Sequence, residues 1–173
     1  DHLEKLLKRQ TTTGQKLIVT ESVFSTEGSI APLSEIMKLC DQYNAVPIID
    51  DSHGLGVLGE EGRGILEAAG VEDFSGLYTA SLGKAVANSG GVICGEQDAI
   101  DYLRYHLSHL IYSTAIPPAV LGGIKAVLAI IKQEFAQLSD RMRQYKSQLQ
   151  AALAETNFEI IDSEAPINSI KGG

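Results

Sequence analysis

The sequence is poor in cysteine, in basic side chains and in long apolar runs. Its 173 residues include two cysteines, Cys40 and Cys94, which are too few for a disulfide framework or a zinc knuckle. Acidic side chains outnumber basic ones by 22 to 14, and the net charge of −8 argues against a nucleic-acid partner. No apolar run is long enough to span a bilayer, and the opening stretch DHLEKLLKRQ is unlike a secretory signal. We therefore expect a cytoplasmic protein with no membrane partner.

The remaining composition is that of an ordinary globular chain. Hydrophobic residues make up 44% and charged residues 21%, enough to build one domain with a sizeable core. Cys40 and Cys94 both lie in apolar surroundings, so we expect buried structural thiols. The chain lacks an initiator methionine, and its last residues, INSIKGG, resemble the start of a strand. We expect a piece of a longer protein.

The first half of the chain has the pattern of a parallel sheet. Apolar runs at 16–22 and 46–50 flank a segment, 33–43, in which apolar residues recur at helical spacing. Strand, helix and strand within about 35 residues indicate a βαβ unit, whose two strands are parallel. Further strand candidates follow at 76–81 and 90–95.

The second half is predicted to be mainly helical. We predict helices at 96–107, 117–135 and 139–155, with the second buried because it is nearly all apolar. Ser139 is the expected N-cap of the third helix, and a strand is expected at 157–162.

The predicted fold class is α/β, a mostly parallel sheet with flanking helices. We predict part of a large domain over residues 1–136 and the start of a small α+β domain over 137–173.

The stretch GLGVLGEEGRG, residues 54–64, begins with the G-x-G-x-x-G spacing of a dinucleotide-binding turn. Such a turn opens a helix at its third glycine, and an acid ends the next strand about 20 residues on. Here two further glycines interrupt any helix, and the next strand candidate ends at Ser81 without an acid. We interpret this stretch as a tight loop that passes close to another part of the molecule.

Asp50 and His53 lie where a strand ends, which is where open α/β sheets bind ligands. One interpretation is structural, with Asp50 and Asp51 capping the turn and His53 bonded locally. Another is a metal-dependent hydrolase, because carboxylates and imidazole can hold a divalent ion. A metal would need more ligands, and the other strand ends offer mainly Glu21 and hydroxyl groups.

A third interpretation depends on Lys84, which follows the next strand end within TASLGKAVANSGG. Surface lysines are common, but a lysine that is desolvated among small residues becomes an amine nucleophile. Pyridoxal phosphate needs such a lysine, an aspartate for its ring nitrogen, and hydroxyl and N–H groups for its phosphate. Asp50, His53, Ser81 and Lys84 supply these groups together, so the combination favours a pyridoxal-phosphate site.

Four stretches of the chain resemble the α-oxoamine synthases, which are pyridoxal-phosphate enzymes of the aspartate-aminotransferase fold. They are ESVFSTEGSIAPLSEI, IIDDSHGLGVLGEEGRG, TASLGKAVANSGG and HLIYSTAIPP. The likeness covers about residues 1–155 and includes the order and spacing of all four.

The resemblance implies three catalytic residues. Lys84 would carry the cofactor covalently and move the substrate's α-proton. Asp50 would pair with the pyridine nitrogen, and His53 would hydrogen-bond the phenolic oxygen of the ring.

The resemblance also implies further contacts. Ser25 and Ser81 would contact the cofactor's oxygen or phosphate, and Ser113 and Thr114 would reach a phosphate across a homodimer interface. Glu21 is our candidate for substrate binding.

Enzymes of this family condense an amino acid with an acyl-CoA thioester, lose carbon dioxide and release an α-amino ketone. The motifs are most similar to those of the member that uses alanine and a pimeloyl thioester in biotin synthesis. Members that use glycine with acetyl-CoA, or serine with a palmitoyl thioester, are the alternatives. A non-catalytic partner subunit is a further alternative, although it would have no need of Lys84.

The family's stacking histidine and carboxylate-binding arginine have no counterpart here, so we expect activity only from a longer parent.

Overall fold

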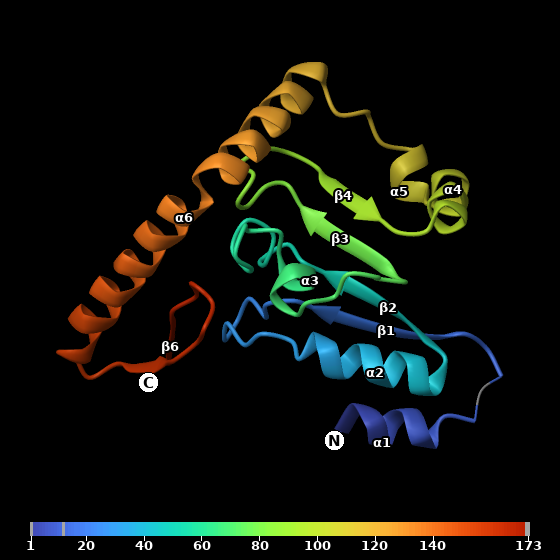
Figure 1. The fold of residues 1–173 in the computed structure, drawn as a ribbon, viewed down its shortest axis with the longest axis horizontal. Helices are drawn as coiled ribbons and strands as arrows, with labels where there is room; N and C mark the ends of the chain where they lie inside the picture. Colours follow the sequence, from blue (N-terminus) through green and yellow to red (C-terminus); the bar gives the residue numbers. More distant parts are fainter. Residues whose placement is uncertain (1, 12, 172–173) are drawn as a thin grey trace.

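The central sheet contains four strands in the order β1-β2-β3-β4 (Figure 1). β1 (Lys16–Glu21), β2 (Ala45–Asp50) and β3 (Leu77–Ser81) are parallel, and β4 (Gly91–Cys94) is antiparallel to β3. The structure, a computed structural model, describes residues 2–11 and 13–171. Expectations for residues 1, 12, 172 and 173 lie outside it. The predicted α/β class and mostly parallel sheet are confirmed.

Helices and a small second sheet complete the fold. The helices are α1 (His2–Arg9), α2 (Leu33–Tyr43), α3 (Ile65–Ala68), α4 (Gln97–His106), α5 (Ser108–Ile111) and α6 (Pro118–Ala154). β5 (Glu159–Ile161) and β6 (Ser169–Lys171) form an antiparallel pair beyond α6.

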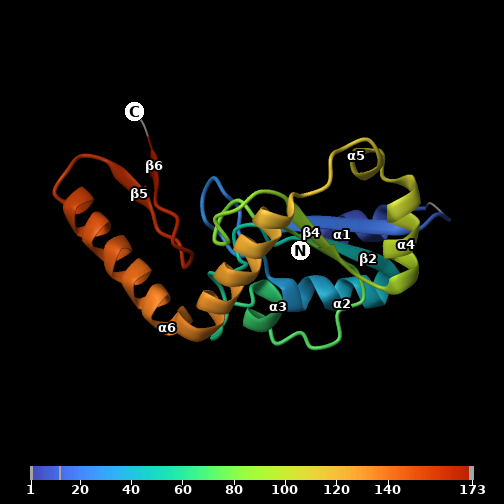
Figure 2. The same ribbon diagram turned by 90° about the horizontal axis from the view of Figure 1, so that it is seen from above.

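α2 connects β1 to β2 and covers one face of the sheet together with α3 (Figure 2). Its buried residues, Leu33, Ile36 and Cys40, recur at helical spacing and form the face that packs on the strands. The helix ends at Asn44, whose left-handed backbone, with φ 50°, lets its N–H bond to the carbonyl of Cys40. The chain thereby reverses directly into β2, as a βαβ unit requires.

Three apolar clusters hold these layers together. One joins α1, β1 and α2, and a second joins α2, β2 and α3 around Ile49, which is completely buried. The third joins the turn after β3 to α6 through Leu82, Val86 and Ile124. The carboxyl ends of β2 and β3 therefore lie between two packed clusters.

α6 differs from the prediction, because one continuous helix of 37 residues replaces the two predicted helices. Ser139 lies buried in the middle of α6 and is not an N-cap. No proline or glycine interrupts residues 124–154, so the change from apolar to polar composition marks a change of surroundings and not a break. The predicted burial of 117–135 is also wrong, since Leu128 and Ile130 are exposed. The domain division at residue 136 stays a prediction.

The two cysteines differ in burial. Cys40 is buried in α2 as predicted, but Cys94 is exposed at the end of β4, where the prediction of burial is wrong. The physical reason is that β4 is one of the two edge strands of the sheet and that Cys94 lines an open cavity beside Tyr78 and Lys132.

Within the described ranges, no helix has the length and apolar character needed to cross a membrane.

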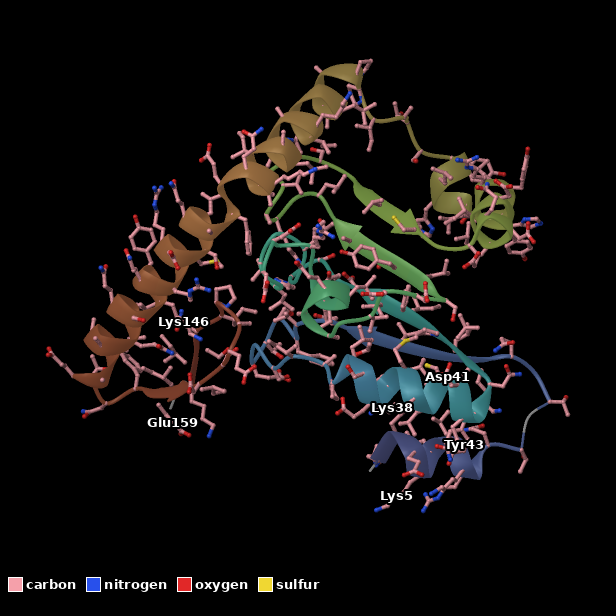
Figure 3. The ribbon with its side chains drawn as sticks, viewed as in Figure 1. Lys5, Lys38, Asp41, Tyr43, Lys146 and Glu159 are labelled. Carbon is pink, nitrogen blue, oxygen red and sulfur yellow. The ribbon has the colours of Figure 1, made fainter. Side chains whose placement is uncertain are left out.

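Hydrogen bonds join the segment before β6 to α6 and to the loop that follows β1. Lys146 points from α6 toward this segment (Figure 3), and its Nζ donates to the carbonyls of Ala165, at 2.9 Å, and Ser163. Ser163 Oγ donates to the carbonyl of Gly28 at 2.5 Å. The C-terminal segment therefore rests against the loop that follows β1.

The continuity of α6 can be tested with Asp140→Pro. In a helix interior, proline removes a backbone hydrogen bond and should lower the free energy of unfolding by about 3 kcal/mol. Asp140→Ala is the control, because it removes only the exposed Asp140–Arg143 ion pair. Thermal unfolding of the intact protein measures both. If Ser139 were an N-cap, residue 140 would be a first helical position, and proline would be tolerated there.

Candidate active site at the carboxyl ends of β2 and β3

The carboxyl ends of the three parallel strands lie at one edge of the sheet. Glu21, Asp50 and Thr79 are aligned across β1, β2 and β3. The strand ends are also tied together beyond this alignment, because Ser52 Oγ accepts a hydrogen bond from the Ser81 N–H at 2.8 Å. The two turns that follow β2 and β3 are therefore held side by side.

Asp50 and His53 are available to a ligand at this edge. Asp50 is exposed, and its carboxylate accepts one hydrogen bond, at 2.9 Å from the Ser52 N–H. That bond fixes the carboxylate at the strand end while leaving its other oxygen accessible. His53 is half-buried in the following turn, and its ring has no hydrogen-bond partner within the described part of the chain.

Lys84 lies on the turn that follows β3. Leu82 and Val86 are buried against α6 and anchor this turn, while Lys84 between them is exposed. Two backbone bonds close the turn, from Leu82 N to Gly90 O at 2.9 Å and from Asn88 N to Leu82 O at 2.8 Å. Among residues 2–11 and 13–171, no carboxylate or hydrogen-bond acceptor engages the Lys84 ammonium group. The structure thus presents an uncommitted amine on a well-fixed turn, and the expected desolvation of Lys84 is wrong, since its side chain is exposed in this chain.

The other predicted site residues lie at varying distances from this edge. Glu21 ends β1, and Ser25 is exposed in the loop that follows. Ser81 ends β3, and its Oγ accepts from the Gly83 N–H at 3.2 Å. Ser113 and Thr114 are exposed beyond α5, which lies near the opposite end of the sheet (Figure 1). The chain therefore does not place its own Ser113 and Thr114 beside Asp50, and their predicted contact across a dimer stays a prediction.

Asp51 is a central residue of this region, which the sequence suggests only as one of two acids that cap the turn. Successive side chains of a strand point to opposite faces, so Asp51 points away from its neighbour Asp50. It is completely buried, and Oδ2 accepts hydrogen bonds from the Ile65 N–H at 3.0 Å and from the Tyr78 hydroxyl at 2.8 Å. An acid directly after an apolar strand, with glycines crowded around it, is the signal that could have found it.

Burial shifts the pKa values of both Asp51 and Tyr78. Desolvation raises the pKa of Asp51, and the hydrogen bonds from Ile65 and Tyr78 oppose that rise. The Ser22 hydroxyl also opposes it, although Ser22 Oγ and Asp51 Oδ1 do not reach hydrogen-bond geometry in the described structure. Burial, followed by the adjacent Asp51 carboxyl, raises the pKa of Tyr78. Tyr78 therefore remains a neutral hydrogen-bond donor at physiological pH.

The glycine-rich loop closes around Asp51, which confirms the predicted close approach. A Cβ at Gly64 would overlap Asp51 Oδ2, and one at Gly54 would overlap Oδ1. Gly64 also has φ +91°, a backbone conformation that side chains other than hydrogen disfavour. Gly62 lies against the ring of Phe135 on α6. These glycines serve a carboxyl and a neighbouring helix, and no long helix opens at the third glycine.

The groups at this edge fit one of the predicted ligands better than the other. In the described ranges, no three His, Cys, Asp or Glu side chains gather so that they could hold a metal ion. Pyridoxal phosphate requires an amine, a carboxylate for the ring nitrogen and hydroxyl donors. Lys84, Asp50, His53 and Ser81 provide that chemistry on two adjacent turns.

The whole chain, residues 1–173, matches the model of the aminotransferase class I and II family, and it belongs to this family. It is 39% identical to the 8-amino-7-oxononanoate synthase of Cupriavidus necator over 97% of its own length and 43% of that protein. The chain thus spans less than half the length of this relative.

Solved structures give the same assignment. The serine palmitoyltransferase of Sphingomonas wittichii superposes with a TM-score of 0.83 at 27% identity, over 95% of this chain and 41% of that one. The 8-amino-7-oxononanoate synthase of Francisella tularensis gives 0.77 at 28% identity, over 97% and 49%. The resemblance to the α-oxoamine synthases is confirmed.

The close fit of the glycine loop around Asp51 can be tested with Gly64→Ala. The new methyl group would meet Asp51 Oδ2 in an unfavourable backbone conformation, so the free energy of unfolding should fall by about 3 kcal/mol. Gly70→Ala is the matched control: its φ is +64°, but nothing lies within 4 Å of a Cβ there, so the cost should be about 1 kcal/mol. Thermal unfolding of both variants measures the difference, and equal losses would contradict the described packing.

Proposed function

We propose that the intact protein is a pyridoxal-phosphate-dependent acyltransferase that condenses L-alanine with a pimeloyl thioester, as 8-amino-7-oxononanoate synthases do. The observation that carries the proposal is that an exposed carboxylate, Asp50, and an uncommitted amine, Lys84, lie on adjacent turns. The 39% identity to the Cupriavidus necator enzyme supports the choice of substrates. This reaction is a step in biotin synthesis.

Each of the three central residues has a distinct task in this proposal. When bound, pyridoxal phosphate supplies an electron sink for the charge that develops on the α-carbon of the amino acid. Asp50 holds the proton on the ring nitrogen, which maintains that electron sink. His53 donates a hydrogen bond to the phenolic oxygen. Lys84 binds the cofactor and then, as a free amine, removes and returns the α-proton.

The phosphate and the substrates involve further residues. Ser81 and Ser25 offer hydroxyl groups to the cofactor, and Glu21 contacts the amino-acid substrate. Ser113 and Thr114 act in a homodimer, where they reach the partner's phosphate. Exposed aromatic side chains beside them support such an interface, since Tyr112 is 88% and Tyr105 79% exposed.

We further propose a large cofactor domain over residues 1–136 and a small domain that begins at 137. The separation of the central sheet from the β5–β6 pair supports this division. Two free cysteines support a cytoplasmic location, because reduced thiols persist there.

A serine palmitoyltransferase is the second candidate. The TM-score of 0.83 with the Sphingomonas wittichii enzyme favours it, but the sequence identity of 27% is lower than the 39% found with the Cupriavidus necator synthase. A product assay with alanine or serine, each offered pimeloyl and palmitoyl thioesters, separates the two. The proposal requires product from alanine with the pimeloyl thioester, and turnover of serine with the palmitoyl thioester alone would favour the second candidate.

The lysine assignment can be tested without turnover. The intact protein is loaded with pyridoxal phosphate and reduced with borohydride, and peptide mass spectrometry then locates the fixed cofactor. We expect the label on Lys84 and its complete loss in Lys84→Ala, because the reduced bond needs the amine. Lys125→Ala removes an exposed lysine of α6 and should leave the label unchanged. A label that persists in Lys84→Ala would refute the assignment.

A further inference from the structure

Asp51 has no part in the proposed chemistry, yet it lies in the chain between Asp50 and His53. Asp50 is exposed at the candidate site, whereas the Asp51 carboxyl is completely buried on the other side of the strand. The same short turn therefore carries two groups toward the cofactor position and one group into the protein.

Asp51 connects three elements through its backbone and its carboxyl. The backbone N–H of Asp51 donates to the carbonyl of Thr79 in β3 at 2.7 Å. Its Oδ2 accepts from the Tyr78 hydroxyl of β3 at 2.8 Å and from the Ile65 N–H, where α3 begins, at 3.0 Å. Its backbone carbonyl accepts from Leu55 N at 2.8 Å, which closes the turn around His53.

Little freedom is left to the turn once these bonds are made. Gly54 and Gly64 approach the two carboxyl oxygens so closely that neither could carry a Cβ without overlap. A shift of Asp51 would therefore displace the backbone on both sides of His53. Catalytic groups lose much of their effect when they are misplaced by about 1 Å.

We propose that Asp51 is a positioning residue, which holds Asp50 and His53 in register with the Lys84 turn by accepting hydrogen bonds from Tyr78 and Ile65. This inference rests on the proposed function, because it concerns where the two cofactor contacts are held.

The role requires a hydrogen-bond acceptor and not a charge. In the described structure, no lysine, arginine or histidine pairs with Asp51, and its two donors, a tyrosine and a backbone amide, are neutral. An asparagine has nearly the same shape. Its carbonyl oxygen could accept both bonds, and its NH₂ group would face the buried Ser22 Oγ, which can accept.

Four variants separate positioning from simple stabilisation. Asp51→Asn keeps the acceptor, Asp51→Leu removes it while keeping the same branching of heavy atoms, and Tyr78→Phe removes one of the two donors. Ile36→Val is the matched control, because it loosens the separate cluster of α1, β1 and α2 without touching the turn. All are made in the intact protein and loaded with pyridoxal phosphate.

The readout is the pH at which the visible absorbance of the bound cofactor changes, since groups that contact the ring set this midpoint. We expect Asp51→Leu to shift it by about one pH unit, equivalent to losing one hydrogen bond to a charged group. Tyr78→Phe should shift it less and in the same direction. Asp51→Asn should match the wild type, and Ile36→Val should lower the melting temperature without moving the midpoint.

Several outcomes overturn the proposal. A midpoint in Asp51→Asn displaced as far as in Asp51→Leu would mean that charge matters. An unmoved midpoint in Asp51→Leu, with a lowered melting temperature, would mean that Asp51 only stabilises the fold. If Asp51→Leu does not fold, an unmoved midpoint in Tyr78→Phe overturns the proposal by itself. Failure of borohydride to label Lys84 in the wild type overturns the proposed function as well, whereas a labelled Lys84 with unmoved midpoints overturns this inference alone.

Discussion

The buried carboxyl of Asp51 is the constraint on which the candidate site depends. Removing an acid from water costs free energy, and in this protein that cost is offset by hydrogen bonds from Tyr78 and Ile65. The bond from Ile65 is possible because the glycine loop passes close to the carboxyl, and this close approach explains why glycine occupies positions 54 and 64. A polar interaction that does not face the ligand therefore determines the shape of the turn that does.

The sheet and the helices give this turn its surroundings. Parallel alignment brings the ends of β2 and β3 to one edge, and the bond between Ser52 Oγ and Ser81 N–H ties the two turns together. Leu82 and Val86 anchor the Lys84 turn by packing against α6. The carboxylate and the amine thus reach the edge from separately packed elements, as a site that must keep its geometry through a reaction requires.

Much of this arrangement could be predicted from the sequence, because it follows from local patterns. Two apolar runs on either side of a segment with helical spacing predict the βαβ unit, and parallel strands necessarily bring Asp50 and the Lys84 turn to the same end of the sheet.

Non-local features could not be predicted. Whether residues 136–140 interrupt a helix has no local signal when no helix-breaking residue is present, and the exposure of Cys94 depends on which strand forms the edge. The opposite surroundings of Asp50 and Asp51 follow from strand alternation, but their roles emerge only when Tyr78 and Ile65 are seen to meet the second carboxyl. The contacts predicted for Ser25, Ser113 and Thr114 stay predictions.

The central claim, that Asp51 is buried and held by neutral donors, is tested most directly by titrating its carboxyl carbon. In protein labelled with ¹³C at the aspartate side chains, Asp51→Asn assigns the signal by its disappearance. The account predicts a pKa above the usual value of 3.8, because burial outweighs the hydrogen bonds that favour the charged form. A pKa at or below that value would show that the carboxyl is solvated or paired with a cation, and would contradict the account.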